Sequence, residues 1–195
     1  YNMTKFKMLI YVIAQCLSVL SVNAQAHWES IILSTDTFKY VVATSTATSP
    51  GTVTTWYGTT FNDNAWKKAK GPIGYGDGDD NTTISNCNSV YLRSTFPVTD
   101  TSLISDLILD IDYDDAFVAY LNGVAVAHST NLGYTNPAYN AGLMGEREAL
   151  MYSGGLPERY TIDRKKLKNG TNLLAIQVLN FSSTSDDLSS IVFLN

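Results

Sequence analysis

The stretch FVAYLNGVAVAH, residues 117–128, constrains the fold of this chain more than any other segment. Two apolar runs flank Asn122-Gly123, a pair that tolerates the positive φ required at both central positions of a type I′ turn. The pattern predicts a tight hairpin in which residues 117–121 pair with residues 124–128.

Most of the remaining chain shows the same β pattern, with short apolar, β-branched and aromatic runs between clusters of Gly, Asn, Asp and Ser. One run has Leu107, Leu109, Ile111 and Tyr113 on one face and Asp110 and Asp112 on the other, as in a strand with one buried face. Besides the hairpin, the segments expected to form strands are 30–33, 38–43, 90–96, 107–113, 172–179 and 188–194.

Little of the sequence favours a helix. NDNAWKKA, residues 62–69, is expected to form one helical turn, and TATSPGT, residues 46–52, a loop. No other window sustains a periodicity of 3.6 residues. About eight strands joined by loops therefore predict an all-β fold, a two-sheet antiparallel β-sandwich or jelly roll.

The N-terminal residues 1–26 have the features of a secretory signal peptide. Lys5 and Lys7 precede an apolar run, and VNAQA then offers cleavage after Ala24 or Ala26. The expected mature part, residues 27–195, is a secreted or cell-surface protein. Because it also ends directly after an expected strand, we expect it to be the N-terminal module of a longer protein.

The charge of the mature part argues against a nucleic-acid partner. The whole chain carries a net charge of −5, and removal of the two N-terminal lysines leaves 11 basic and 18 acidic residues, a net charge of −7. Such a domain repels phosphate backbones. Cys87 is the one cysteine left after cleavage, and we expect it to be a small buried hydrophobic residue.

The stretch GPIGYGDGDD, residues 71–80, combines four glycines with three aspartates. It matches neither a phosphate-binding loop nor a dinucleotide-binding turn, because the required spacing and following helix are missing. Three interpretations remain open: a solvated acidic turn, a ligand-facing loop, and an irregular calcium site. The candidate ligand-binding residues here are Tyr75, Asp77, Asp79 and Asp80.

A second acidic group, Asp114-Asp115, ends an expected strand just before the hairpin. Adjacent carboxylates at a strand end can hold a cation, and calcium accepts such oxygen ligands. They can equally form the turn by hydrogen bonding to nearby backbone N–H groups. Both alternatives stay open on the residues alone.

Loop aromatics suggest carbohydrate, whose C–H faces stack on rings while its hydroxyls reach Asp and Asn side chains. Tyr134 and Tyr139 join Tyr75 as candidate contacts, whereas Trp56 and Trp66 are expected to fill the end of the sandwich. Catalytic motifs such as G-x-S-x-G and H-E-x-x-H are missing from the sequence. Paired carboxylates can cleave a glycoside, but nothing in the sequence selects a pair.

An ordered set of motifs resembles the galactose-binding-like jelly-roll modules of secreted bacterial proteins. The motifs are FNDNAW, GPIGYGDGDD, VYLRSTF, DYDDAFVAYLNG, NLLAIQVLN and SSTSDDL, and they extend over about residues 28–195. Such modules often precede a CotH-kinase-type, lamin-tail or metallophosphoesterase domain. The resemblance implies a non-catalytic accessory module that binds glycan or cell-surface material.

The Asp-Asp pair before YLNG is also similar to that of protective-antigen-type lectin domains, in which the pair helps to hold calcium. The resemblance implies a calcium role for Asp114 and Asp115, although Ala116 stands where glycine commonly follows. The competing expectation is a structural module that packs against a downstream domain and binds no small molecule.

Overall fold

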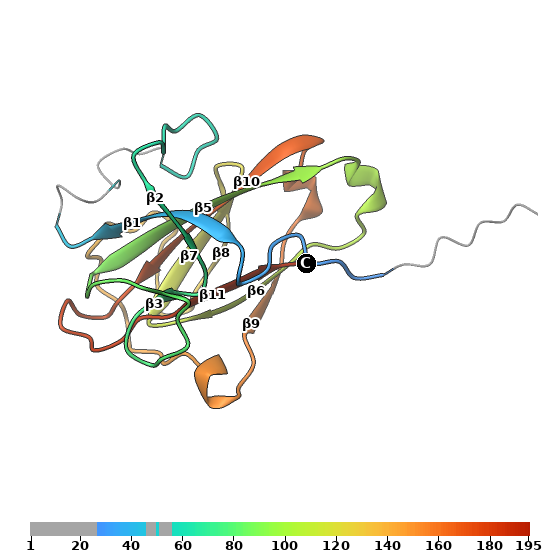
Figure 1. Ribbon diagram of the computed structural model, residues 1–195. Helices are drawn as coiled ribbons and strands as arrows, with labels where there is room; N and C mark the ends of the chain where they lie inside the picture. The colour runs from blue at the N-terminus through green and yellow to red at the C-terminus, as the bar shows by residue number, and fades with distance from the viewer. Residues whose placement is uncertain (1–26, 46–49, 51–55) are drawn as a thin grey trace, which may run out of the picture.

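A computed structural model describes residues 27–45, 50 and 56–195, which form a β-sandwich (Figure 1). A six-stranded sheet has the order β2-β1-β5-β10-β7-β8, a three-stranded sheet the order β11-β6-β9, and β3 pairs with β4 alone. The strands are β1 (Thr37–Ala43), β2 (Lys67–Lys70), β3 (Ile73–Gly74), β4 (Thr82–Thr83), β5 (Ser89–Val98), β6 (Ile108–Tyr113), β7 (Ala116–Leu121), β8 (Val124–His128), β9 (Glu158–Thr161), β10 (Gly170–Leu179) and β11 (Ser190–Leu194).

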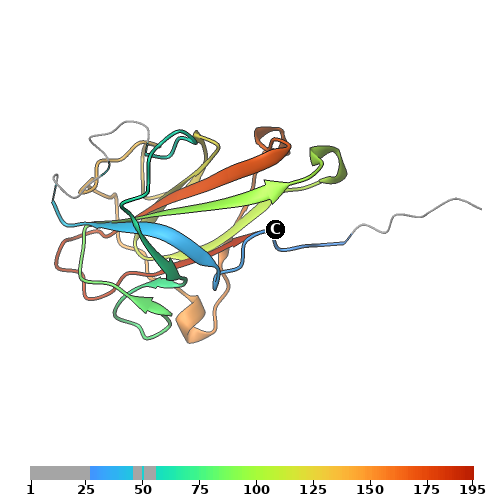
Figure 2. The ribbon, with the colours of Figure 1, turned by 45° about the horizontal axis from the view of Figure 1, so that its top comes forward.

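The two larger sheets lie as separate layers (Figures 1 and 2), and all strand pairs within them are antiparallel. The main core fills the space between the layers. As predicted, Leu107, Leu109, Ile111 and Tyr113 all point into this core from β6 and its approach. The sequence prediction of an all-β sandwich is therefore confirmed.

The six-stranded sheet is also covered on its outer face. Side chains that alternate with the core residues along these strands, such as Tyr91 on β5 and Tyr120 on β7, point to the outer face and form a second cluster with Trp56. The Trp56 ring meets both tyrosine rings edge-on, with centroids 4.8 and 5.5 Å apart. Both faces are therefore buried over residues 89–93 of β5, all of β7 and residues 172–179 of β10.

The predicted hairpin is present as β7 and β8. Asn122 has φ 52° and Gly123 φ 88°, the positive values that the turn needs. The Asn122 side chain donates to Asn172 Oδ1 at 2.7 Å and accepts from the Leu173 N–H at 3.0 Å. This side chain ties the turn to the neighbouring strand β10, so the hairpin is held from outside as well as by its own pairing.

Two local predictions were wrong. The helical turn expected at residues 62–69 is a turn followed by β2, because residues 67–70 pair with β1 along a sheet edge. The strand expected at residues 30–33 is reduced to a single bridge between Ile32 and Leu194. The expected signal peptide and most of the loop at residues 46–52 lie outside the described residues.

The described part of the chain contains helix only as short 3-10 turns: η2 (Thr101–Leu103), η3 (Met151–Ser153) and η4 (Arg164–Lys166). No helix found there has the length and apolar character that crossing a membrane requires. Cys87 is a free thiol in the main core, as expected.

Replacement of a single leucine tests the core assignment. We expect Leu109→Ala to lower the free energy of unfolding by about 2–5 kcal/mol, because it leaves a cavity between the sheets. Leu109 is fully buried, whereas Leu103 in η2 is 83% exposed. The matched control Leu103→Ala should change stability by less than about 0.5 kcal/mol. Urea unfolding measures both, and equal effects would contradict the placement of the core.

Candidate functional site

The glycines of residues 71–80, the glycine loop, allow this segment to lie directly against residues 186–188. A Cβ on Gly74 would stand 2.0 Å from the Leu188 carbonyl oxygen, and one on Gly76 would stand 2.4 Å from the Asp187 Cβ. Gly76 also has φ 111°, a conformation that L side chains rarely adopt. Tyr75 and Leu188 complete the contact with two backbone hydrogen bonds of 3.0 and 2.8 Å.

The glycine loop carries the first group of carboxylates at its C-terminal end. Oxygens of Asp77, Asp79 and Asp80 lie within 4.8 Å of one another. Asp77 accepts a hydrogen bond from the Ser189 hydroxyl at 2.8 Å. Its other oxygen, both oxygens of Asp79 and one oxygen of Asp80 are buried without a hydrogen-bond partner. Buried, unpartnered carboxylate oxygens are costly, so this group favours a proton or a cation.

Burial and mutual repulsion raise the pKa values of this group. The pKa of Asp80 rises to about 7, first through burial and then through the charges of Asp79 and Asp77. The pKa of Asp79 rises to about 6 through burial and its contacts with Asp77. Near neutral pH these carboxyls are therefore partly protonated when no cation is bound.

A second group adjoins the first. Carboxylate oxygens of Asp114, Glu148 and Asp187 lie within 4.8 Å of one another. Asp114 is only 2% exposed. Burial, followed by the charges of Asp115, Asp187 and Glu148, raises its pKa to about 8. The close approach of Gly76 to Asp187 brings the segment of Asp77 next to this second group, and the charge of Asp77 contributes to the raised pKa of Asp187.

We call these six residues, Asp77, Asp79, Asp80, Asp114, Glu148 and Asp187, the acidic cluster. None of these six residues forms an ion pair with another described residue. The cluster is thus a concentration of negative charge drawn from four separate segments of the chain.

Two neighbouring aspartates position the cluster instead of joining it. Asp115 accepts the backbone N–H groups of Arg147 at 2.9 Å and Phe181 at 2.7 Å. Asp112 accepts those of Leu150 at 2.7 Å and Met151 at 2.6 Å. Both oxygens of Asp115 are used in this way. These bonds anchor the loop that carries Glu148, because that residue lies between the anchored positions.

Asp114 and Asp115, which the sequence predicted as a metal-binding pair, have different roles in the structure. The Asp114 carboxyl belongs to the acidic cluster, while the Asp115 carboxyl is bonded to backbone N–H groups. Asp115 does bond to backbone N–H groups, but these belong to Arg147 and Phe181, which are distant in the chain, and not to the local turn that the sequence suggested. The predicted ligand residues Asp77, Asp79 and Asp80 join Asp114 in one region, which the sequence did not anticipate.

The three candidate tyrosines lie in different surroundings. Tyr75 is 5% exposed, and its hydroxyl accepts from Asn180 at 2.7 Å and donates to the Ser185 carbonyl at 3.3 Å. Its ring is in the core, so it supports the glycine loop and presents no open face. Tyr139 is half-buried against the outer cluster of the six-stranded sheet. Tyr134 is 46% exposed.

Sequence reasoning missed the exposed apolar side chains in the chain segments around Glu148 and before Asp187. Met144, Leu150, Tyr152 and Phe181, which we call the apolar rim, are each at least 44% exposed. The backbone N–H groups of Leu150 and Phe181 bind Asp112 and Asp115, so these two residues lie next to the aspartates that position the cluster. Glu148 and Asp187 were missed as well. Only the acidic SSTSDDL motif pointed toward Asp187, and nothing local singled out Glu148.

Comparisons with known proteins show a shared fold. No protein-family model and no curated protein matches the chain. A solved β-glucuronidase from Bacteroides uniformis aligns over 85% of this chain with a TM-score of 0.52 and 16% identity. Bacteroides uniformis β-glucuronidase 2, covalently bound to cyclophellitol-6-carboxylate aziridine, aligns over 85% with a TM-score of 0.51 and 17% identity. This chain covers 17% of the length of each enzyme chain, so the match concerns one β-sandwich within a larger protein.

The raised pKa values predict an unusual pH dependence of stability in the absence of divalent cations. Asp79, Asp80 and Asp114 hold their protons more tightly in the folded state than at the usual value of 3.8. Their favourable contribution is therefore complete below about pH 4 and is lost as the pH rises toward about 8.

Urea unfolding in a chelator should accordingly show stability falling between pH 5 and pH 8. Asp114→Asn should flatten this fall. The control Asp106→Asn, which changes an exposed acid outside the cluster, should leave it unchanged. Stability that rises with pH over this range would contradict the assignment.

Proposed function

We propose that this chain is a non-catalytic, exported module that binds carbohydrate at the acidic cluster with the help of calcium. The observation that carries the proposal is the convergence of two predicted acidic sites into one region that holds four buried, unpartnered carboxylate oxygens. The neighbouring apolar rim supplies surface for the apolar faces of a sugar. The shared fold with parts of two β-glucuronidases is compatible with a role in carbohydrate binding.

The donor set fits calcium better than a transition metal. All six side chains of the cluster are carboxylates, and hard oxygen ligands suit calcium. Asp77, Asp79 and Asp80 would hold one cation, and Asp114, Glu148 and Asp187 are placed to hold another. Bound calcium would supply positive charge that sugar hydroxyls can approach. Without it, the carboxylates themselves accept hydroxyl protons.

Phe181 has the best position in the apolar rim to contact a sugar ring. It is 44% exposed, and its own N–H is fixed by the Asp115 carboxylate at 2.7 Å. Phe181 therefore lies next to Asp115, the chain neighbour of Asp114. A sugar bound here would stack one face on Phe181 and turn its hydroxyls toward the acids.

Calcium binding should raise thermal stability. Because a ligand that binds only the folded state stabilises it by mass action, we expect about 2.7 kcal/mol at a free calcium concentration of 100 times Kd. Asp79→Asn and Asp114→Asn should each reduce this stabilisation, whereas Asp106→Asn should not. A melting temperature that does not respond to millimolar calcium would refute the metal part of the proposal.

Glycan binding is tested on an array, with and without chelator. We expect a signal that falls when calcium is removed and that weakens by about tenfold in Phe181→Ala, the loss typical of one stacked ring. The control Leu103→Ala removes an exposed apolar side chain from η2 and should bind normally. Failure to bind any glycan at millimolar concentration would defeat the proposal.

The alternative function is a structural module that packs against another domain of the same polypeptide. The observation that favours it is the set of large apolar side chains left exposed in this chain, among them Leu103 at 83%, Leu156 at 79% and Trp28 at 67%. These side chains would be covered by such a partner. Association of the module with neighbouring domains of its full-length protein, together with an empty glycan array, would select this function.

A further inference from the structure

Three cations stand in register across neighbouring strands of the six-stranded sheet. Lys68 on β2 lies directly opposite Lys39 on β1, and Lys39 lies directly opposite Arg93 on β5. We call these residues the cationic row. Like charges that face each other across strands are destabilising, so a row of three calls for negative charge nearby.

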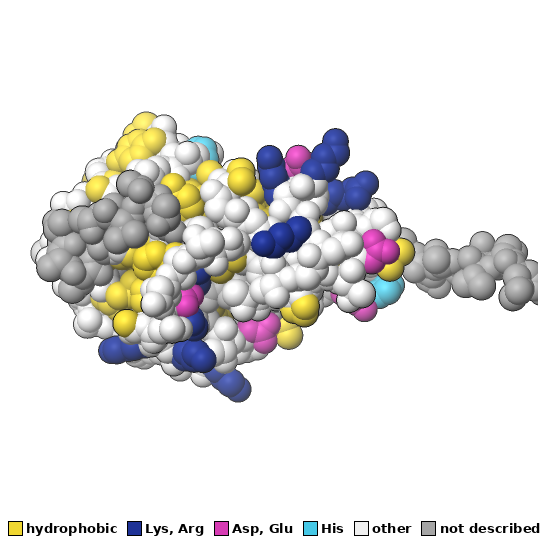
Figure 3. Space-filling model, turned by 90° about the horizontal axis from the view of Figure 1, so that it is seen from above, with side chains coloured by type: hydrophobic (Ala, Val, Ile, Leu, Met, Phe, Trp, Pro, Cys, Tyr) yellow, Lys and Arg dark blue, Asp and Glu magenta, His cyan; other side chains and the backbone are white. Residues whose placement is uncertain are grey.

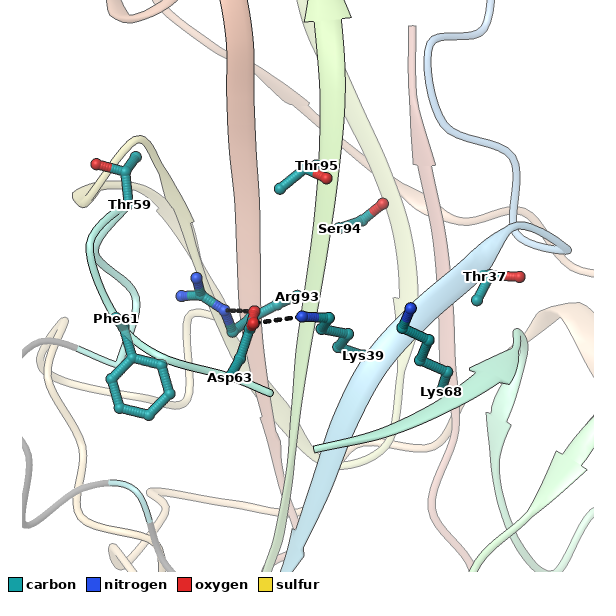
Figure 4. Close-up of a pocket in the computed structure, with 9 residues that line it drawn as sticks. All are labelled: Thr37, Lys39, Thr59, Phe61, Asp63, Lys68, Arg93, Ser94 and Thr95. Carbon is teal, nitrogen blue, oxygen red and sulfur yellow. Dashed lines mark hydrogen bonds and ion pairs between the residues drawn. The ribbon is translucent and has the colours of Figure 1, made fainter. Parts of the chain in front are cut away.

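One carboxylate, Asp63, supplies part of that charge. It accepts hydrogen bonds from Lys39 Nζ at 2.5 Å and from Arg93 Nε at 2.8 Å (Figure 4). Burial of the Asp63 carboxyl works against its charged form, but the hydrogen bonds from Lys39 and Arg93 outweigh burial and lower its pKa. Asp63 is therefore a permanent anion in this row at neutral pH.

Arg93 is the fixed end of the row. It is 4% exposed, and its Nη1 donates to the carbonyl oxygens of Trp56 and, at 3.2 Å, Gly58. The rings of Phe61 and Trp66 lie 5.3 and 5.9 Å from its guanidinium carbon. These contacts hold Arg93, and through it Asp63, in one position.

Lys68 is the open end. It is exposed and takes part in no ion pair within the described residues. Figure 4 shows its amine beside Lys39 with no contact drawn to Asp63. The three positive charges of the row thus face one negative charge, that of Asp63. The uncompensated positive charge lies at the Lys68 end of the row.

A hollow of about 340 Å³ lies over the row. Besides the row and Asp63, its lining includes four hydroxyl-bearing side chains, those of Thr37, Thr59, Ser94 and Thr95, and the ring of Phe61. A volume near 300 Å³ is at the lower end of small-molecule sites and suits one or two sugar units. In Figure 3 basic side chains gather at the lower left of the view with an acidic side chain among them.

We infer that this hollow is a second binding site, separate from the acidic cluster, for a sugar unit that carries a carboxylate or sulfate group. The oxyanion would lie between Lys68 and Lys39, where its charge relieves their repulsion. Asp63 would accept a sugar hydroxyl, and the threonine and serine hydroxyls would bind others. The choice of a sugar as ligand rests on the proposed function, whereas the anion site rests on the cationic row alone.

The experiment is calorimetric titration of the chain in chelator at low salt with three oligosaccharides of equal length. A polygalacturonate oligomer carries carboxylates, a sulfated dextran oligomer carries sulfates, and a plain dextran oligomer is neutral. We expect one or both charged oligomers to bind and the neutral oligomer not to bind. The two charged arms distinguish which oxyanion the site takes.

The variant Lys68→Gln should weaken this binding by about tenfold, the loss of one charge-assisted hydrogen bond. Two controls each remove one positive charge elsewhere: Lys67→Gln on the alternate face of β2, and Lys165→Gln in the basic segment at residues 164–168. Both should stay within about twofold of the parent chain, since an exposed charge contributes little at a distance.

Three results would overturn the inference: no binding of either charged oligomer at millimolar concentration, equal binding of the neutral oligomer, or equal weakening by all three variants. Because chelator is present throughout, the titration measures binding at the row without calcium at the acidic cluster. Failure of the calcium-dependent glycan site and failure of the cationic row are therefore told apart.

Discussion

The close contact between the glycine loop and residues 186–188 is the constraint on which the acidic cluster depends. No side chain fits at Gly74 or Gly76, because a Cβ at either position would overlap atoms of the opposing segment. The loop therefore runs beside Leu188 as a strand-like bridge, and its aspartates arrive next to Asp187. Glycine at these two positions allows the two backbone segments to approach closely. The same approach concentrates negative charge at this end of the loop.

That concentration is tolerated because the surrounding fold is rigid and partly compensates it. Asp112 and Asp115, which lie beside the cluster, each accept two backbone N–H groups, and Arg147 pairs with Asp112 at 3.2 Å. Such bonds give a buried carboxylate the partners that it would otherwise have in water. Asp114 has much less of this support, and burial raises its pKa to about 8, above the values of about 6 for Asp79 and about 7 for Asp80. The fold thus gives Asp112 and Asp115 backbone hydrogen-bond donors and leaves the acidic cluster to a proton or a cation.

The parts of the structure that could be predicted from the sequence are those specified by local patterns. Alternation fixed the inward face of β6, and Asn122-Gly123 fixed the β7–β8 turn. The helical turn at residues 62–69 failed because pairing with β1 decides the conformation of β2, and no local pattern reports a partner so distant in the chain. The local sequence around Tyr75 was equally insufficient to predict its environment. A tyrosine among glycines and aspartates reads as a ligand contact, yet Asn180, more than a hundred residues away, gives its hydroxyl a buried partner.

The acidic cluster and the cationic row also constrain each other through charge. The mature chain is expected to be strongly acidic, so an anionic sugar approaching the row meets overall repulsion. Mobile ions screen that repulsion beyond about 8 Å at physiological salt, and the row acts at shorter range. At about 0.01 M salt the screening length grows to about 30 Å, and there calcium held by the acidic cluster would remove part of the opposing charge. Affinity for an anion at the row would then rise, and by reciprocity an occupied row would favour calcium. Any coupling between the two proposed sites is therefore a property of low salt, because at physiological salt each site acts through its own short-range contacts.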